Sequence, residues 1–224
     1  MKAFIFDVDG TLAETEELHR DAFNAAFARE GLSWHWDFHR YKDLLAVSGG
    51  KERIRHFVET ENIETAGPLD DLVVRLHQSK TDIYGAMVRG GRLPLRAGVA
   101  DLVAEAKRRG LRLAIATTTS RENVDTLLGV ALGGTDDFEV IACGDMVPKK
   151  KPAPDVYLLA LRELELGAGD CLAFEDSSNG LRAAKGAGLR CIVTPALYTE
   201  DEHFADADLV LTDLRDHAPI FALG

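Results

Sequence analysis

The sequence has 224 residues and a net charge of −11 at pH 7, with 46% hydrophobic and 28% charged residues. This length suffices for a sizeable core, in one large domain or two smaller ones, and the composition is typical of soluble globular proteins. The acidic balance argues against a general binder of nucleic acid or anionic membranes, while local lysines and a metal can still create a site for a small anion. No apolar run is long enough to cross a bilayer and no signal peptide precedes Asp7. We expect a cytoplasmic monomer that acts on a small molecule, with no nucleic-acid or membrane partner.

The three cysteines, Cys143, Cys171 and Cys191, are odd in number and scattered along the chain. Cys171 and Cys191 lie in apolar runs that are typical of buried strands. Cysteines in a cytosolic protein usually remain reduced. We therefore expect buried free thiols rather than disulfides or metal ligands.

The chain opens with an apolar run over residues 2–6, which predicts a buried strand. Asp7 and Asp9 follow at its carboxyl end, and their spacing points both carboxylates to the same side. Two adjacent carboxylates repel each other unless a cation lies between them or one of them binds a proton. Gly10 and Thr11 then predict a turn. Taken alone, the pattern also fits two aspartates that cap a turn.

From Glu14 to about residue 88 the pattern is helical. Apolar residues recur at helical spacing up to Glu30, and Gly31 ends this first helix. Further helices are predicted over residues 37–47, 51–60 and 69–87. Glycine and proline separate these stretches. The segment predicts a small domain of four helices.

A composition shift at residues 90–94, Gly-Gly-Arg-Leu-Pro, predicts a linker. Beyond it, helices are predicted over 98–109, 121–128, 154–164 and 180–187, and strands over 111–116, 138–142, 171–174, 190–193 and 209–211. This alternation predicts a parallel sheet with helices on both faces, which the opening strand must join. We therefore predict an α/β fold with a Rossmann-like core, formed by residues 1–13 and 94–224, and an inserted four-helix cap domain, residues 14–93.

Open parallel sheets bind ligands at the carboxyl ends of their strands. Polar residues follow four of the predicted strands: Asp7 and Asp9, Thr117 to Ser120, Lys149 to Lys151, and Glu175 to Ser177. Carboxylates, hydroxyls and ammonium groups at one edge are the groups that Mg²⁺-assisted phosphoryl transfer requires. The sequence therefore predicts this class of reaction and a Mg²⁺ cofactor.

Together these blocks resemble the haloacid dehalogenase-like phosphotransferase superfamily, whose motifs are D-x-D-G-T, a threonine after the second strand, a lysine before a helix, and E-D after the fourth strand. The motifs occur in the expected order, and the resemblance covers the whole chain. Lys-Pro-Ala-Pro-Asp at 151–155 resembles the β-phosphoglucomutase-like branch. Residues 14–19, 34–36 with Tyr41, and 48–53 are similar to CbbY-type sugar-bisphosphate phosphatases. Those enzymes are associated with removing xylulose-1,5-bisphosphate, an inhibitor of the Calvin-cycle enzyme rubisco.

The resemblance implies that Asp7 is the nucleophile and forms an aspartyl-phosphate, which divides one difficult displacement into two easier ones. Asp9 is then the general acid that protonates the leaving alkoxide, and later the base that activates water. The negative charge of Asp7 is expected to raise the pKa of Asp9.

The resemblance also implies a Mg²⁺ site and a phosphoryl site. The side chains of Asp7 and Asp176 and the backbone carbonyl of Asp9 hold the ion, and Glu175 supports it through water. The transferring phosphoryl oxygens are held by Thr117 and Lys151.

Substrate selection is expected to depend on the cap and its surroundings. By the same resemblance, Glu16 binds a sugar hydroxyl, and Tyr41 and Thr118 are further substrate-binding residues. His19 is expected to orient Asp9 or to gate cap closure, and an ordinary surface histidine is the alternative.

Two more cap features carry predicted substrate contacts. Gly49, Gly50 and Lys51 form a glycine turn that opens a helix, which suits a distal phosphate and equally suits an ordinary helix start. Lys80 matches a cap lysine of the β-phosphoglucomutase-like branch, with a solvated helix face as the alternative.

Four polar residues near the motifs are expected to lie outside the chemistry. Ser177 and Asn179 are predicted to cap the helix after the fourth strand. Lys149 and Lys150 are expected to be exposed to solvent, because three adjacent lysines cannot all point into one site.

The sequence therefore predicts a Mg²⁺-dependent phosphatase of a small sugar bisphosphate, with xylulose-1,5-bisphosphate implied by the resemblance. A mutase similar to β-phosphoglucomutase, with the same core chemistry, is one alternative. A catalytically inactive binding module on the same fold is another, because fold alone does not establish function. We also expect the cap to close over the core, with hinges near residues 13–14 and 90–94.

Overall fold

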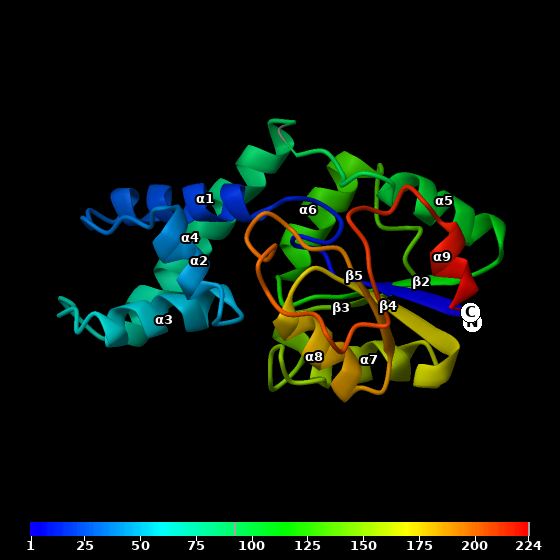
Figure 1. The fold of residues 1–224 in the computed structure, drawn as a ribbon. Helices are drawn as coiled ribbons and strands as arrows, with labels where there is room; N and C mark the ends of the chain where they lie inside the picture. The colour runs from blue at the N-terminus through cyan, green and yellow to red at the C-terminus, as the bar shows by residue number, and fades with distance from the viewer. Residues whose placement is uncertain (92, 224) are drawn as a thin grey trace.

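The computed structural model describes residues 1–91 and 93–223 and consists of two parts lying side by side (Figure 1). One part is a sheet flanked by helices, and the other comprises the helices α1 to α4. This arrangement confirms the predicted α/β core with an inserted four-helix cap. Arg92, in the predicted linker, lies outside the described residues, and the domain limits at 13/14 and 93/94 stay a prediction.

Within the described residues, six parallel strands form one sheet in the order β3-β2-β1-β4-β5-β6. The strands are Ala3–Phe6 (β1), Arg112–Ala116 (β2), Val140–Ala142 (β3), Cys171–Glu175 (β4), Arg190–Val193 (β5) and Leu209–Val210 (β6). β1 lies in the middle, with Ile5 opposite both Ala114 of β2 and Ala173 of β4. Because parallel strands end at the same edge, the residues after β1, β2 and β4 meet there.

Helices cover both faces of the sheet (Figure 1). One face packs against α5 (Val99–Arg108), α6 (Arg121–Ala131) and α9 (Ala218–Ala222), and the other against α7 (Asp155–Glu163) and α8 (Ser178–Gly186). Side chains of β1 alternate between the two apolar clusters, with Phe4 and Phe6 in the first and Ala3 and Ile5 in the second. Since both faces are covered, β1 is buried along its whole length, which explains its continuous apolar run.

The cap consists of α1 (Glu16–Arg29), α2 (Phe38–Leu44), α3 (Gly50–Thr60) and α4 (Leu69–Arg89). Aromatic rings form much of its core: Phe23 and Phe27 each lie 4.8 Å from Trp36, centroid to centroid. Tyr198, from the loop after β5, joins this cluster. An apolar contact therefore connects the cap to the sheet part.

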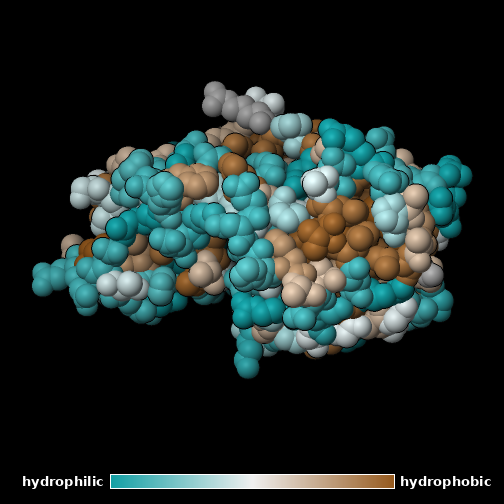
Figure 2. Space-filling view, viewed as in Figure 1, coloured by the Kyte–Doolittle hydropathy of each residue, from teal (hydrophilic) through white to brown (hydrophobic). Residues whose placement is uncertain are grey.

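The predicted helices and strands are present, with ends displaced by a few residues. The prediction omitted α9, because five residues are too few for a periodic pattern. All three cysteines are free and buried, as expected. Figure 2 shows a mostly hydrophilic surface over the cap, while apolar side chains gather over the sheet part. In the described part of the chain, none of the helices has the length and apolar character needed to cross a membrane.

Candidate active site

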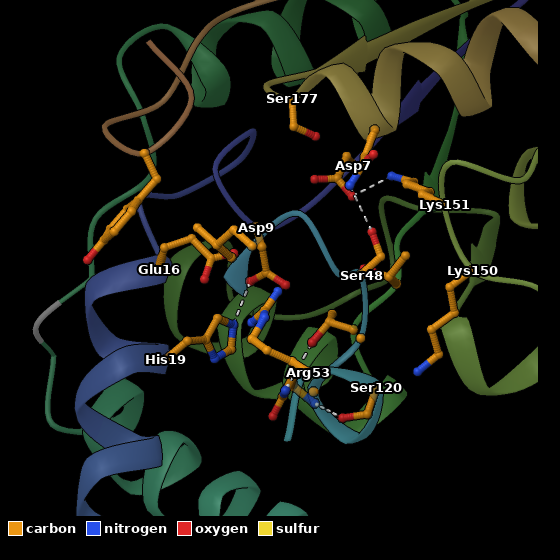
Figure 3. A pocket seen from close by; sticks show the side chains of 18 of the residues that line it. Asp7, Asp9, Glu16, His19, Ser48, Arg53, Ser120, Lys150, Lys151 and Ser177 are labelled. Carbon is orange, nitrogen blue, oxygen red and sulfur yellow. Dashed lines mark hydrogen bonds and ion pairs between the residues drawn. The ribbon is translucent and has the colours of Figure 1, made fainter. Parts of the chain in front are cut away.

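A cavity lies between the cap and the carboxyl edge of the sheet (Figure 3). It contains about 1040 Å³ of space, part of it open to solvent, which suits a small ligand. The sheet part lines it with Asp7, Asp9, Thr118, Thr119, Ser120, Lys150, Lys151, Glu175, Asp176 and Ser177. The cap lines it with Glu16, His19, Ser48, Gly49, Gly50, Lys51, Arg53, His77 and Lys80. Among the predicted site residues, Thr117 and Tyr41 do not line it.

Asp7 and Lys151 form a buried ion pair at the end of β1. The Lys151 ammonium donates to Asp7 Oδ1 at 2.7 Å (Figure 3). It also donates to Glu175 Oε1 at 2.6 Å. Glu175 Oε1 also accepts a hydrogen bond from the Tyr157 hydroxyl at 2.6 Å. Burial would lower the pKa of Lys151, but the carboxylates of Asp7 and Glu175 raise it above its usual value. Lys151 therefore stays charged beside Asp7.

Two further carboxylates, those of Glu175 and Asp176, lie close to Asp7 of this pair. One oxygen from each of Asp7, Glu175 and Asp176 lies within 4.8 Å of the others, and all three residues are buried. Gly10 permits this approach: its φ is +80°, and a Cβ there would lie 2.3 Å from Asp176 Oδ2. The glycine of the D-x-D-G-T motif is thus required both for the turn and for the space that Asp176 occupies.

The carboxylate cluster fits a divalent cation. Burial raises the pKa of Asp7 to about 7, although Lys151 opposes this shift. Burial and the charges of Asp7 and Glu175 raise the pKa of Asp176 well above its usual value. Glu175 Oε2 is buried and lacks a hydrogen-bond partner in the described chain. Hard oxygen ligands of this kind suit Mg²⁺, and a cation would offset the repulsion that raises these pKa values.

Asp9 belongs to a separate hydrogen-bond network with the cap. Its Oδ1 accepts from the Thr15 hydroxyl at 2.6 Å, and it lies 3.0 Å from His19 Nε2 (Figure 3). His19 Nδ1 lies 2.7 Å from the buried Lys80 ammonium. Because an ammonium only donates, Nδ1 is the acceptor and Nε2 carries the proton toward Asp9. Of the two roles expected for His19, this geometry favours orientation of Asp9.

The expected rise in the pKa of Asp9 is wrong for this structure. Burial would raise this pKa, but His19, the hydrogen bond from Thr15 and the charge of Lys80 together lower it below its usual value. Lys80 itself is only 5% exposed, so the alternative of a solvated lysine is wrong as well. Burial lowers the pKa of Lys80 to about 8.

Thr117 follows β2 but is buried behind the cavity wall. Its backbone N–H donates to the Ala142 carbonyl, and its hydroxyl accepts from the Thr119 N–H at 3.2 Å. Thr118, the next residue, lines the cavity. The structure therefore places Thr118 at the cavity and gives Thr117 a loop-fixing hydrogen bond, while a phosphoryl contact of Thr117 stays a prediction.

Glu16 faces the cavity and is held from behind by two cap residues. The Tyr41 hydroxyl donates to Glu16 Oε2 at 2.6 Å, and Arg53 Nη1 donates to the Tyr41 hydroxyl at 3.1 Å. Tyr41 is fully buried in the aromatic core of the cap, where it positions Glu16, and a direct contact of Tyr41 with substrate stays a prediction.

The glycine turn before α3 also reaches the cavity. Gly49 has a φ of +97°, and a Cβ there would lie 2.3 Å from Glu52 Oε2 and 2.7 Å from Lys150 Cδ. Gly50 begins α3, whose N-terminus has no side-chain cap. With Lys51 beside it, this turn offers free backbone N–H groups and a positive charge at the cavity wall.

Lys150 is not exposed, contrary to the expectation. It lines the cavity, and its ammonium donates to Glu52 of α3 at 3.1 Å, which joins the loop before α7 to the cap. Lys149 is exposed, as expected. Ser177 caps α8 by accepting from the Gly180 N–H, whereas Asn179 donates to the Ala46 carbonyl of the cap at 3.2 Å.

Sequence reasoning missed several lining residues. His77 and Arg53 come from the inner faces of cap helices, and Tyr198, Thr199 and Glu202 come from the loop after β5. The carboxyl-edge rule, applied to the strand predicted at residues 190–193, would have included this loop. No local pattern identifies Arg53, because its contacts with the Leu44 and Val47 carbonyls arise only when α2 and α3 pack together.

Comparisons with known proteins agree with this site. The family of haloacid dehalogenase-like hydrolases matches residues 1–188. Protein CbbY of Cereibacter sphaeroides is 54% identical over 218 residues, covering 96% of this chain and 94% of that protein. The crystal structure of CbbY from Rhodobacter sphaeroides in complex with phosphate has a TM-score of 0.92 and 51% identity, over 97% of this chain and 96% of that chain. A variant of that protein, crystallised with xylulose-(1,5)bisphosphate, gives the same values.

The chain therefore belongs to the haloacid dehalogenase-like hydrolases, and it is a phosphatase. Within that family it is similar to the CbbY proteins, as the residues of the cap suggested. β-Phosphoglucomutase from Clostridium difficile has the same fold, with a TM-score of 0.83 and 21% identity over 100% of this chain and 96% of that chain.

Proposed function

We propose that this phosphatase hydrolyses one ester of a small sugar bisphosphate, with xylulose-1,5-bisphosphate as the leading candidate. The proposal rests on one observation: the two ends of a single cavity carry different chemical groups. One end holds the buried pair of Asp7 and Lys151 with its carboxylates, and the other presents Lys51 and the turn before α3. The first end suits phosphoryl transfer, and the second suits a further phosphate group.

Two comparisons support this substrate class. The CbbY protein of Rhodobacter sphaeroides, which has the same fold at 51% identity, was crystallised with phosphate and, as a variant, with xylulose-(1,5)bisphosphate. A phosphorylated carbohydrates phosphatase from Thermotoga maritima is 32% identical to this chain over 193 residues.

In the proposed mechanism, Asp7 attacks the phosphorus atom and becomes an aspartyl-phosphate, while the ester oxygen departs with its electron pair. Lys151 is placed to neutralise the phosphoryl oxygens, because its ammonium lies 2.7 Å from the nucleophile. Removing one such donor typically costs about 2.7–4 kcal/mol of transition-state stabilisation. Thr117 and Thr118 are the proposed hydroxyl-bearing residues of the phosphoryl site.

Asp9 is the proposed proton donor to the departing alkoxide, and it later accepts a proton from the water that attacks the aspartyl-phosphate. Because His19 and Lys80 lower its pKa in this structure, the proposal requires that the negative charge of the bound phosphate raise this pKa, so that Asp9 binds the proton that it then donates. The hydrogen bonds from Thr15 and His19 fix the Asp9 carboxylate, and Lys80 fixes the His19 ring. Because His19 and Lys80 belong to cap helices, the position of the acid depends on the position of the cap. Closure of the cap over the core, with hinges near residues 13–14 and 90–94, is part of the proposal.

The proposed cofactor is Mg²⁺. Asp7 and Asp176 would hold it with their side chains and Asp9 with its backbone carbonyl, while Glu175 would act through water. When bound, the ion supplies positive charge that offsets the repulsion between the substrate phosphate and the carboxylates.

A panel of phosphorylated sugars, ranked by kcat/KM with Mg²⁺ and with a chelator, tests the proposal. We expect sugar bisphosphates to rank first, with xylulose-1,5-bisphosphate at the top, and we expect chelation to abolish turnover. If β-glucose-1-phosphate with a bisphosphate primer gives isomerised product and no free phosphate, the enzyme is a mutase and the proposal fails. Inactivity toward the whole panel would contradict it as well.

A further inference from the structure

The loop after β5, residues 194–202, contributes to a part of the cavity wall that the mechanism above does not use. Both ends of the loop are held by the sheet part. At the first end, the Arg96 guanidinium donates to two backbone carbonyls of the loop, each at 2.7 Å. At the second end, the Glu202 carboxylate accepts from the Ser178 N–H at 2.6 Å. The residues between these ends can therefore contact the cap while the loop stays attached to the sheet part.

Thr199 connects the middle of this loop to Asp176. Its buried hydroxyl donates to the Asp176 backbone carbonyl at 2.7 Å and lies 3.5 Å from Asp176 Oδ2. The same hydroxyl accepts from the Ala196 N–H at 2.9 Å, so it acts as donor and acceptor at once. In the described chain, no other side chain hydrogen-bonds to Asp176. Thr199 therefore holds Asp176 in place, while the charges of Asp7 and Glu175 repel the Asp176 carboxylate.

Tyr198, the residue before Thr199, packs into the cap. Its ring stacks on Phe38 with centroids 4.6 Å apart and lies edge-on to Tyr41 at 5.6 Å. Its hydroxyl donates to the Glu17 carboxylate of α1, and only 3% of the residue is exposed. A buried ring with aromatic neighbours supplies a large contact of defined geometry. Successive residues of one loop thus contact the cap core and Asp176.

This arrangement bears on the ion site, because Asp176 is one of the proposed Mg²⁺ ligands. Groups that hydrogen-bond to a metal ligand fix its orientation and strongly affect the affinity for the metal. Here the group that does so, Thr199, is joined by one peptide bond to a residue packed in the cap. A movement of the cap that displaces Tyr198 must also displace Thr199.

We propose that Thr199 is a positioning residue for Asp176, and that Tyr198 makes the affinity for Mg²⁺ depend on the docking of the cap. The inference rests on the proposed function and its cofactor and extends them to two residues outside the family motifs. By linkage, an ion held at Asp176 favours the docked cap by the same factor as the docked cap favours the ion. The site then binds its ion most tightly while the cap covers it.

Titration calorimetry of Mg²⁺ into the enzyme without substrate tests the role of Thr199. Thr199→Val keeps the shape of the side chain and removes the hydroxyl, whereas Thr199→Ser keeps the hydroxyl. We expect Thr199→Val to raise the Kd for Mg²⁺ roughly 10- to 100-fold and Thr199→Ser to leave it nearly unchanged. Thr81→Val is the matched control and should not alter this Kd, because Thr81 is a buried threonine of α4 whose hydroxyl has no partner in the described chain.

The dependence of the rate on Mg²⁺ gives a second readout for the same variants. If Thr199 acts through the ion, the activity lost in Thr199→Val should return as the Mg²⁺ concentration is raised, whereas general damage to the fold would not be reversed in this way. An unchanged Kd for Mg²⁺ in folded Thr199→Val protein, or a rate that stays low at saturating Mg²⁺, overturns the role of Thr199.

Tyr198→Leu tests the connection to the cap. Leucine keeps an apolar side chain but lacks the stacked ring and the hydroxyl. We expect the Kd for Mg²⁺ to rise, although the Tyr198 hydroxyl bonds to Glu17 and not to the carboxylates of the ion site. Combined with Thr199→Val, the substitution should add little, since both act through the same contact.

Three outcomes separate the claims. No effect of Tyr198→Leu on the Kd for Mg²⁺, or fully additive effects of the two substitutions, overturns the dependence on the cap. If the unsubstituted enzyme binds no Mg²⁺, the proposed cofactor itself fails and the inference falls with it.

Discussion

The two ends of the cavity are built in different ways. At the sheet edge, Asp7, Lys151, Glu175 and Asp176 are each at most 6% exposed, and three of them directly follow or end parallel strands. At the cap end, Glu16 and its neighbours project from helices, and side-chain hydrogen bonds hold them in place. The backbone of the sheet thus fixes the reacting groups, while cap packing fixes the recognition groups. Substitutions at the first end should lower kcat, and substitutions at the second should raise KM.

The largest expected effect at the sheet end is that of Asp7→Asn. Removing the nucleophile should lower kcat by roughly four to six orders of magnitude, since losing a nucleophile in other enzymes of covalent mechanism has this effect. Asparagine has the same shape, so the far-ultraviolet circular dichroism spectrum should not change. Substantial retained activity would remove Asp7 from the proposed role.

Lys151→Met is expected to affect both rate and stability. The rate should fall about 100- to 1000-fold, because a positive charge on the transferring phosphate is lost. Unfolding in denaturant without Mg²⁺ should show a loss of about 3–5 kcal/mol, because Asp7 and Glu175 remain buried without their cation. Lys149→Met, at the exposed lysine two residues earlier, is the control and should change neither. Equal effects of Lys151→Met and Lys149→Met would contradict the role proposed for Lys151.

A matched pair of tyrosines compares the two ends directly. Tyr41→Phe removes the hydrogen bond to Glu16 at the cap end, and Tyr157→Phe removes the one to Glu175 at the sheet end. Each bond is worth about 1.5–3 kcal/mol because its acceptor is charged. Steady-state kinetics should show a higher KM for Tyr41→Phe, roughly tenfold, and a lower kcat for Tyr157→Phe. If both variants changed the same kinetic parameter, the proposed difference between the two ends of the cavity would be wrong.

The smallest expected effect concerns the ion pair between the two parts. Lys150 and Glu52 lie 3.1 Å apart, but the Glu52 side chain is 43% exposed, so solvent weakens their attraction. A double-mutant cycle with Lys150→Met and Glu52→Gln, followed by denaturant unfolding, should give a coupling of about 0.2–1 kcal/mol. A much larger coupling would mean that this pair, rather than the apolar contacts of Tyr198, Tyr84 and Val88, holds the cap against the core.

The sheet end of the site could be predicted from the sequence because its determinants are local. Burial on both faces makes β1 a continuous apolar run, and strand alternation then places Asp7 and Asp9 at the edge. Parallel pairing brings the residues after β2 and β4 to the same edge. Only the structure explains why Gly10 is needed in the first motif: a side chain at this position would occupy the space taken by Asp176.

The cap end could not be predicted in the same way, because its contacts join residues far apart in the chain. The lowered pKa of Asp9 depends on His19 and Lys80 from two different helices. The position of Lys150 depends on Glu52, almost a hundred residues earlier in the chain. Tyr41 has the appearance of a recognition residue in sequence, yet packing of the cap encloses it and leaves Glu16 at the cavity.

Detection of the covalent intermediate tests the central claim most directly. The enzyme is mixed with xylulose-1,5-bisphosphate and Mg²⁺, quenched in acid within the first turnovers, digested and examined by mass spectrometry. We predict the mass of one phosphoryl group on the peptide that contains Asp7, appearing before steady state and disappearing as substrate is consumed. Steady release of phosphate while that peptide remains unmodified at every time would contradict the account.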